Sequence, residues 1–144
     1  MQRIEALTDV IAAAHRLGRL VARTAGSTTP AAQWRALSIL EESGPLRVGA
    51  LATAARVTQP GMTRLIELMS ASGLVERHPD PADARAVVIE ITDAGRRART
   101  EWIETARAAL APAFADLTDD EWAAIQTTAA LLNARTAHLA NGTE

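Results

Sequence analysis

Polar side chains with the chemistry for reading DNA bases gather on one side of a predicted helix over residues 58–72. Apolar residues recur there at spacings of three and four, which places them together on the opposite side. The polar side carries Gln59, Pro60, Thr63, Arg64 and Glu67. A guanidinium can pair with guanine and a glutamine amide with adenine, whereas Thr63 is better suited to a phosphate or a thymine methyl. The alternative interpretation is that Arg64 pairs with Glu67 on a solvated helix.

A second group of side chains lies in a turn-rich stretch further along the chain. Residues 78–86 include two prolines and two aspartates, so we expect a loop rather than a tight hairpin between two strands. Arg85 could reach from this loop into a minor groove, with Asp83 holding its guanidinium in place. The alternative is a surface ion pair worth at most about 1 kcal/mol. Arg77 and Arg47 are expected to contact phosphates or to pair locally.

A helix-turn-helix followed by a β-wing would position both groups. Thr58 is a suitable N-cap for the helix that carries Arg64, and Gly73 suits a left-handed residue at its end. Thr29 is expected to cap the second helix of the chain, and residues 46–48 could add a third strand to the wing. The expected elements are helices over residues 4–21, 30–42, 49–55 and 58–72, strands over 74–77 and 86–91, and helices over 92–114 and from 118 onward. Such a unit fits two adjacent grooves of DNA.

Length and composition favour one globular domain and exclude several classes of protein. The chain has 144 residues, 48% of them hydrophobic, and no cysteine, which excludes disulfides, thiolate metal ligands and thiol redox sensing. No apolar run approaches the roughly 18 residues of a membrane helix. Arg16 and Arg19 interrupt the first apolar segment, which argues against a secretory signal. We therefore expect a cytoplasmic protein. Residues 55–99 carry seven arginines against six acids, whereas residues 100–144 carry two against seven.

Catalytic and metal-binding patterns are absent from the sequence. We find no G-x-S-x-G, H-E-x-x-H or P-loop motif. The three histidines, His15, His78 and His138, fall in different predicted elements without ligand spacing. The sequence therefore predicts a protein that is not an enzyme and has no catalytic residue, metal or cofactor.

Three motifs in register resemble those of the MarR family of bacterial transcription regulators. The family's G-L-[VI]-x-R, D-x-R-[AS] and L-T-x-x-G patterns are similar to Gly73-Leu74-Val75-Glu76-Arg77, Asp83-Ala84-Arg85-Ala86 and Ile91-Thr92-Asp93-Ala94-Gly95. The resemblance covers nearly the whole chain. The chain departs from the family at Ala84, where arginine is frequent, which implies a weaker hold of the wing on its groove. It also carries Gly61 inside a helix, at a cost of roughly 1 kcal/mol relative to alanine.

The resemblance implies a mainly α (α+β) fold in a single domain over residues 1–144. A winged helix-turn-helix lobe would occupy residues 30–97, and helices over 1–25 and 98–141 would form a dimerisation region. The implied function is that of a ligand-responsive repressor that binds double-stranded DNA as a homodimer, on a pseudo-palindrome with half-sites about 10 base pairs apart. Apolar residues at helical spacing are candidates for the dimer interface: Ile4, Leu7, Ile11, Trp122, Ile125, Leu132 and Leu139.

A small-molecule pocket between the lobe and the dimerisation helices is also implied by the resemblance. His15, Trp34 and Trp102 are candidates to line it, although packing in an interface or core is the commoner role of such residues. A second hypothesis is a protein-interaction module that keeps the winged fold without reading DNA. Salt dependence separates the two hypotheses, because DNA binding weakens steeply with salt and an apolar protein interface does not.

Overall fold

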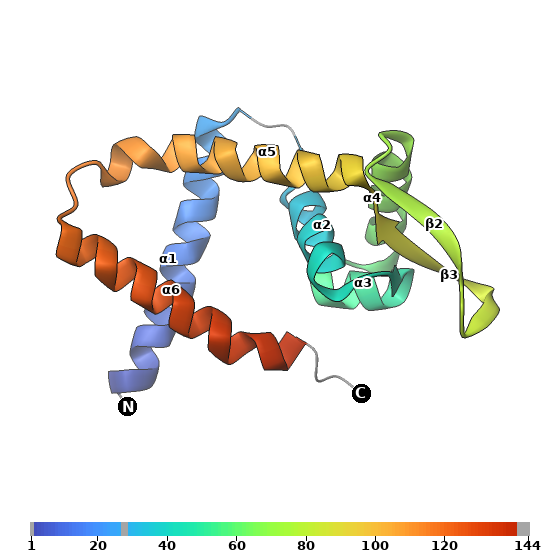
Figure 1. Ribbon diagram of the computed structural model, residues 1–144, viewed down its shortest axis with the longest axis horizontal. Coiled ribbons are helices and arrows are strands. Elements are labelled where there is room, and N and C mark those ends of the chain that lie inside the picture. Colours follow the sequence, from blue (N-terminus) through green and yellow to red (C-terminus); the bar gives the residue numbers. More distant parts are fainter. Residues whose placement is uncertain (1, 27–28, 141–144) are drawn as a thin grey trace. The chain divides into compact units, whose positions relative to one another are not determined.

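A computed structural model gives the backbone of residues 2–26 and 29–140 and the side chains of residues 4–26 and 29–137 (Figure 1). His138 and Leu139 therefore lie outside the described side chains. The chain divides into two compact units, Met1–Ala109 and Leu110–Glu144. Within the described residues, no helix has the length and apolar character needed to cross a membrane.

The first unit is a winged helix-turn-helix preceded by a long helix. In chain order its elements are α1 Gln2–Thr24, α2 Ala31–Ser43, β1 Leu46–Arg47, α3 Val48–Ala55, α4 Gln59–Ala71, β2 Val75–Asp80, β3 Asp83–Ile91 and α5, Asp93–Leu110, whose last residue belongs to the second unit. The hairpin of β2 and β3 projects beyond α4 as the wing (Figure 1). The expected helices and strands are all present, and their bounds lie within a few residues of those predicted.

The sheet is antiparallel and has the order β1-β3-β2. The prediction of a third strand is confirmed, because Leu46 lies opposite Ile89 and Arg47 opposite Val88. Strand β3 is therefore central, and β2 is an edge strand that pairs on one side only.

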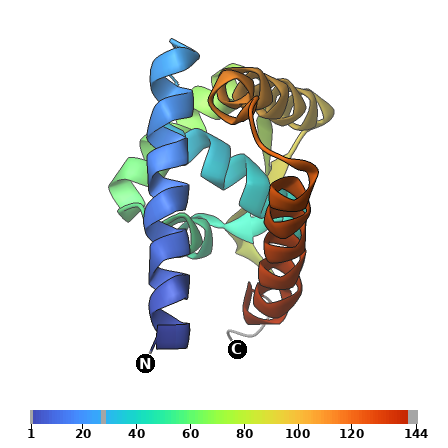
Figure 2. The same ribbon diagram turned by 90° about the vertical axis from the view of Figure 1, so that its left-hand side faces the viewer.

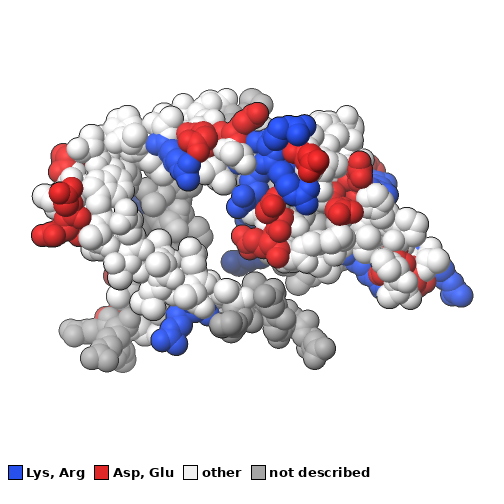
Figure 3. All heavy atoms as spheres, in the orientation of Figure 1, with Lys and Arg blue, Asp and Glu red and all other residues white. Residues whose placement is uncertain are grey.

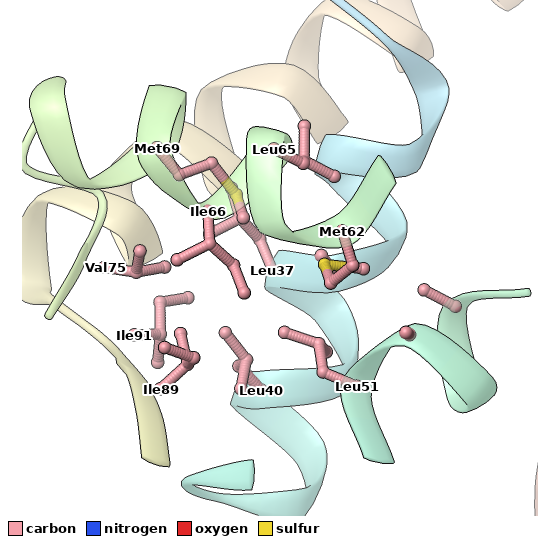
Figure 4. Packing of buried hydrophobic residues seen from close by; sticks show 13 residues of the cluster. Leu37, Leu40, Leu51, Met62, Leu65, Ile66, Met69, Val75, Ile89 and Ile91 are labelled. Carbon is pink, nitrogen blue, oxygen red and sulfur yellow. The ribbon is translucent and has the colours of Figure 1, made fainter. Parts of the chain in front are cut away.

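The core of the lobe forms where α2, α3 and α4 pack on one face of the sheet (Figure 4). Its largest fully buried side chains are Leu37, Leu40, Leu51, Met62, Ile66, Met69, Ile89 and Val75. The helix that carries Arg64 is anchored by its predicted apolar face, since Met62, Leu65, Ile66 and Met69 are all buried. A large part of the stability of α4 comes from this face rather than from helix propensity alone.

The prediction of a loop over residues 78–86 is wrong. Strand β2 continues to Asp80 and β3 starts at Asp83, so only Pro81 and Ala82 remain in the turn. The Asp80 carboxylate accepts a hydrogen bond of 2.8 Å from the Ala82 N–H, which closes the turn. Pro79 is tolerated because β2 is an edge strand, where a missing backbone donor does not interrupt a second ladder. A bulge between Pro79 and Asp80 takes up the irregular register.

The predicted N-cap of α2 is also wrong by one residue. Pro30, not Thr29, occupies the cap position, with extended dihedral angles and no capping side chain. Its carbonyl accepts the Gln33 N–H at 2.9 Å, which begins the hydrogen-bond pattern of the helix. The caps predicted for α4 and α5 are confirmed: Thr58 Oγ1 accepts from Gly61 N–H at 3.2 Å, and Thr92 Oγ1 from Gly95 N–H at 3.0 Å.

The second unit consists of a 3₁₀ turn, η1 Ala111–Phe114, and the long helix α6 Asp119–Ala140, drawn in red in Figure 2. Its capping box is as predicted, because Glu121 N–H donates to Thr118 Oγ1 at 3.3 Å and Thr118 N–H donates to the Glu121 carboxylate at 2.8 Å. The Thr118 backbone N–H, followed by the Thr118 hydroxyl that donates to the same carboxylate at 2.9 Å, lowers the pKa of Glu121. The Trp122 and Phe114 rings lie 6.3 Å apart.

Candidate nucleic-acid interface and ligand pocket

The outer surface of α4 is exposed and carries the predicted base-reading residues. Gln59, Pro60, Thr63 and Arg64 are all exposed. The Thr63 hydroxyl donates to the Gln59 carbonyl at 3.0 Å, which leaves its methyl and its lone pairs available. Gly61 has a local explanation, because a Cβ there would lie 3.0 Å from Thr58 Oγ1. The first turn of α4 therefore packs closely against the side chain of its N-cap residue, Thr58.

The guanidinium of Arg64 is free for a partner. Among the side chains that the structure describes, Arg64 makes no ion pair or hydrogen bond, so the alternative pairing with Glu67 does not occur. The positively charged guanidinium therefore lies on the solvent-exposed side of α4, and the opposite side of this helix packs in the core.

The two faces of the wing differ in charge. Residues directly opposite each other in an antiparallel pair point to the same face, and Arg77 lies opposite Ile89. Since Ile89 is buried in the core with α4, Arg77 leaves the hairpin on the face against which α4 packs. Glu76 lies opposite Glu90, and both point to the other face. The wing is therefore more acidic on the Glu76 face than on the Arg77 face.

On the acidic face, His78 lies between two carboxylates. Its Nε2 is 3.3 Å from Glu76 Oε2 and 3.3 Å from Glu90 Oε2. In the described part of the chain, no group of three acidic or histidine side chains has an arrangement that could hold a metal ion. His78, on β2, thus contacts one carboxylate on its own strand and one on β3.

The wing tip differs from the prediction in how Asp83 is used. Its carboxylate accepts the backbone N–H of Arg85 at 3.0 Å, and no ion pair joins Asp83 to the Arg85 guanidinium among the described side chains. Asp83 shapes the backbone because its short side chain reaches an amide two residues ahead. Arg85 is exposed, and arginine side chains extend at the end of the hairpin in Figure 3.

A bridge from β1 holds the wing tip in place. Arg47 Nε lies 2.6 Å from Asp80 Oδ2, so Arg47 pairs locally, one of its two expected roles. The Ala82 backbone N–H, and secondarily Arg47, lower the pKa of the Asp80 carboxyl from its usual 3.8. The lowered pKa means that the charged form favours the folded wing. This contribution is complete above about pH 4 and is lost as the pH falls through the folded-state pKa.

We expect Asp80→Asn to loosen the wing tip at neutral pH, because the amide replaces a charged acceptor shared by Ala82 and Arg47. Amide hydrogen exchange at Ala82, corrected for its intrinsic pH dependence, should accelerate in the variant. The same acceleration should occur in the wild-type protein on acidification below the folded-state pKa of Asp80. Equal protection in both proteins throughout would contradict the assigned role of this carboxylate.

Two of the three arginines at the start of α5 make contacts within the lobe. Arg96 contacts Glu41 at 3.4 Å and Asp93 at 3.1 Å, and Arg99 Nε donates to Ser38 Oγ at 3.0 Å. Mixed acidic and basic side chains gather over this region in Figure 3. These contacts tie α5 to α2, and of the three arginines only Arg97 makes no ion pair or hydrogen bond with the described side chains.

A pocket of about 670 Å³ lies among α1, α2 and α5 within the first unit. It brings together His15, Trp34 and Trp102, the three residues proposed for a ligand site. The two tryptophan rings stack with their centroids 5.5 Å apart and their planes inclined by 21°. Both are half-buried, so they combine packing with pocket lining.

Two arginines of the pocket were not identified from the sequence. Arg19 and Arg35 line it, and no acidic side chain does so among the described residues. Arg35 Nε also donates to the carbonyl of Ala55, the last residue of α3, at 3.2 Å. An arginine on an exposed helix face gives no sequence signal for such a contact, because its partner lies 20 positions away.

The candidate dimer residues of α1 are exposed, with Ile4 at 64%, Leu7 at 44% and Ile11 at 56%. On α6, Trp122 and Ile125 are exposed at 42% and 43%, and Leu132 is half-buried. These helices thus present apolar surface that their own units leave uncovered.

Comparisons with known proteins agree with this geometry. A family model described as MarR family matches residues 27–86. A helix-turn-helix-type transcriptional regulator of Mycobacterium bovis is 38% identical over 104 residues, which cover 67% of this chain and 73% of the relative. A MarR family protein from Bacillus stearothermophilus has 27% identity and a TM-score of 0.66, over 94% of each chain. BpsR of Bordetella bronchiseptica, whose DNA binding is regulated by 6-hydroxynicotinic acid, has 26% identity and a TM-score of 0.60, over 86% of this chain and 89% of BpsR.

Proposed function

Because this chain belongs to the MarR family of winged-helix DNA-binding transcriptional regulators, we propose that it is a homodimeric, ligand-responsive repressor of a pseudo-palindromic operator. The observation that carries the proposal is the free Arg64 guanidinium on the exposed side of α4. In the major groove, this fork would bind the O6 and N7 atoms of guanine, and Gln59 would bind adenine. Arg85 would enter the minor groove and Arg77 would contact a phosphate.

Dimerisation would set the distance between two such helices. The exposed apolar residues of α1 and α6 form surface that favours burial against a second copy. A twofold dimer places its two recognition helices on half-sites about one helical turn, or 10 base pairs, apart. Bound across a promoter, such a dimer would block transcription.

The pocket would hold the effector. Its stacked tryptophans favour a planar aromatic molecule, and its arginines without a lining acid favour an anion. The related BpsR responds to an aromatic acid of this kind. An anion that engages Arg35 would compete with the Ala55 carbonyl and so release the end of α3. Different affinity for the two states would then shift the protein away from the DNA-binding form.

Selection of operators from a random-sequence DNA library, followed by salt titration, tests the DNA-binding function. A pseudo-palindrome should be enriched, and the logarithm of its binding constant should fall with the logarithm of salt by about 0.9 per phosphate contacted. Absence of any enriched sequence, or an affinity that does not depend on salt, would favour the protein-interaction module instead.

Arg35→Met tests the link between pocket and helix-turn-helix without any ligand. Loss of the bond to Ala55 should weaken operator binding about three- to tenfold, in line with a net hydrogen-bond contribution of about 0.5–1.5 kcal/mol. It should also speed amide exchange at Val57, whose N–H donates to the Ala52 carbonyl at the end of α3. Arg35→Lys keeps a donor and serves as the matched control. Unchanged DNA affinity in Arg35→Met, in a protein with the wild-type circular dichroism spectrum, would contradict the link.

A further inference from the structure

We propose that Leu68 reads thymine by packing against its C5-methyl group in the major groove. The inference rests on the proposed DNA-binding function of α4 and adds to it a residue that determines specificity. No feature of the sequence pattern identified this leucine, because it interrupts an otherwise polar surface rather than extending the apolar face.

Leu68 is the one large apolar side chain of α4 that is exposed to solvent. It is 62% exposed, whereas Met62, Leu65, Ile66 and Met69 of the same helix are buried. It takes no part in the core cluster of the lobe. Its exposure therefore has no explanation in the packing of the described residues, and burial against a partner would remove apolar surface from water.

The position of Leu68 is continuous with the base-reading surface. It follows Arg64 by four residues, so the two side chains are neighbours on one stripe of the helix. Four residues rise about 6 Å along the helix axis, which equals about two base-pair steps of 3.4 Å. A helix that places Arg64 on a guanine would therefore bring Leu68 over the edge of a base pair about two steps away.

Thymine supplies the matching chemistry. The C5-methyl is the apolar group that the major groove exposes, and it distinguishes thymine from cytosine without any hydrogen bond. A leucine cannot satisfy donors or acceptors on the other base edges. Leu68 therefore favours thymine both by contact with its methyl and by leaving polar groups unpaired at a competing base.

Replacement of thymine by deoxyuridine in the selected operator tests the contact, because it removes the methyl alone. One thymine, about two steps from the guanine read by Arg64, should lose about fourfold in affinity, the equivalent of about 0.8 kcal/mol per buried methyl-sized group. Because the substitution changes both protomers of the proposed dimer, Leu68→Ala should bind the thymine operator about 15-fold more weakly than wild type, the product of two such losses. The variant should bind the thymine and deoxyuridine operators equally, because both changes remove the same contact.

Leu68→Met keeps an apolar side chain of similar reach and should retain the preference for thymine. Since Leu68 is exposed, all three proteins should unfold at nearly the same temperature. Equal loss from deoxyuridine in wild type and Leu68→Ala, or an altered oligomeric state with unaltered DNA binding, would overturn the inference and leave the proposed function intact. If the wild-type protein enriched no operator, the proposed function and this inference would both fail.

Discussion

Arg64→Ala is expected to reduce discrimination between operator and scrambled DNA by about 1–3 kcal/mol per half-site, the value of a bidentate contact with guanine. The reason is geometric, because the Arg64 fork is exposed, free of partners, and fixed by the buried face of α4. Truncation therefore removes a base contact while the helix and its core remain. Parallel titrations of both DNAs, at one salt concentration, measure the loss.

Arg77→Ala is the matched comparison for this experiment. Arg77 projects from the wing face on which α4 packs, where a phosphate contact is expected. Its loss should weaken binding to operator and scrambled DNA alike and reduce the salt slope by about 1 per protomer. Unchanged discrimination in Arg64→Ala would remove Arg64 from the base-reading residues, whatever the behaviour of Arg77.

The elements that position Arg64 could be predicted because their signals are local. The spacing of Met62, Leu65, Ile66 and Met69 fixes which side of α4 is buried, and hence which side is exposed. The caps at Thr58 and Thr92 are equally local, since each hydroxyl accepts from an amide three residues ahead. Such patterns need no knowledge of the rest of the fold.

The wing could not be predicted at the same level because its stability comes from distant partners. Two prolines and two aspartates favour a loop when they are considered by themselves. In the structure, β2 gains its ladder from β3, and Asp80 gains its partner Arg47 from β1, 33 positions earlier. The prediction that Asp83 holds the Arg85 guanidinium was wrong because of a local partner. The Asp83 carboxylate accepts the backbone N–H of Arg85, two residues ahead, instead of the guanidinium.

The pocket shows the same limit. Trp34 and Trp102 each sit at a position that helical spacing assigns to packing, and nothing in that spacing indicates that their rings stack. Their separation of 5.5 Å results from the contact of α5 with α2, which Arg99 and Ser38 also support. A pocket formed by residues so far apart in the chain takes its shape only from the tertiary fold.

Gly95 has the tightest surroundings of the glycines that the structure describes, although the sequence motif alone gave no reason for it. A Cβ at this position would lie 2.2 Å from the Leu74 carbonyl oxygen and 2.7 Å from Ile91 Cγ1. The carbonyl cannot withdraw easily, because it accepts the Thr92 N–H at 3.1 Å. The Thr92 hydroxyl in turn donates to the Gly73 carbonyl at 2.5 Å. The start of α5 is thus fixed against the turn that follows α4.

Gly95→Ala should therefore destabilise the lobe by about 3 kcal/mol, the upper part of the usual range for overpacking. This penalty exceeds the gain of about 1 kcal/mol that alanine brings to a helix interior. Gly18→Ala in α1 is the matched control, because no heavy atom lies within 4 Å of a Cβ there and only the gain in propensity remains. Urea unfolding of both variants at one protein concentration should move the two midpoints in opposite directions. A Gly95→Ala midpoint at or above that of the wild type would show that α5 can move away from Leu74, and the fixed position of α5 against the turn after α4 would have to be abandoned.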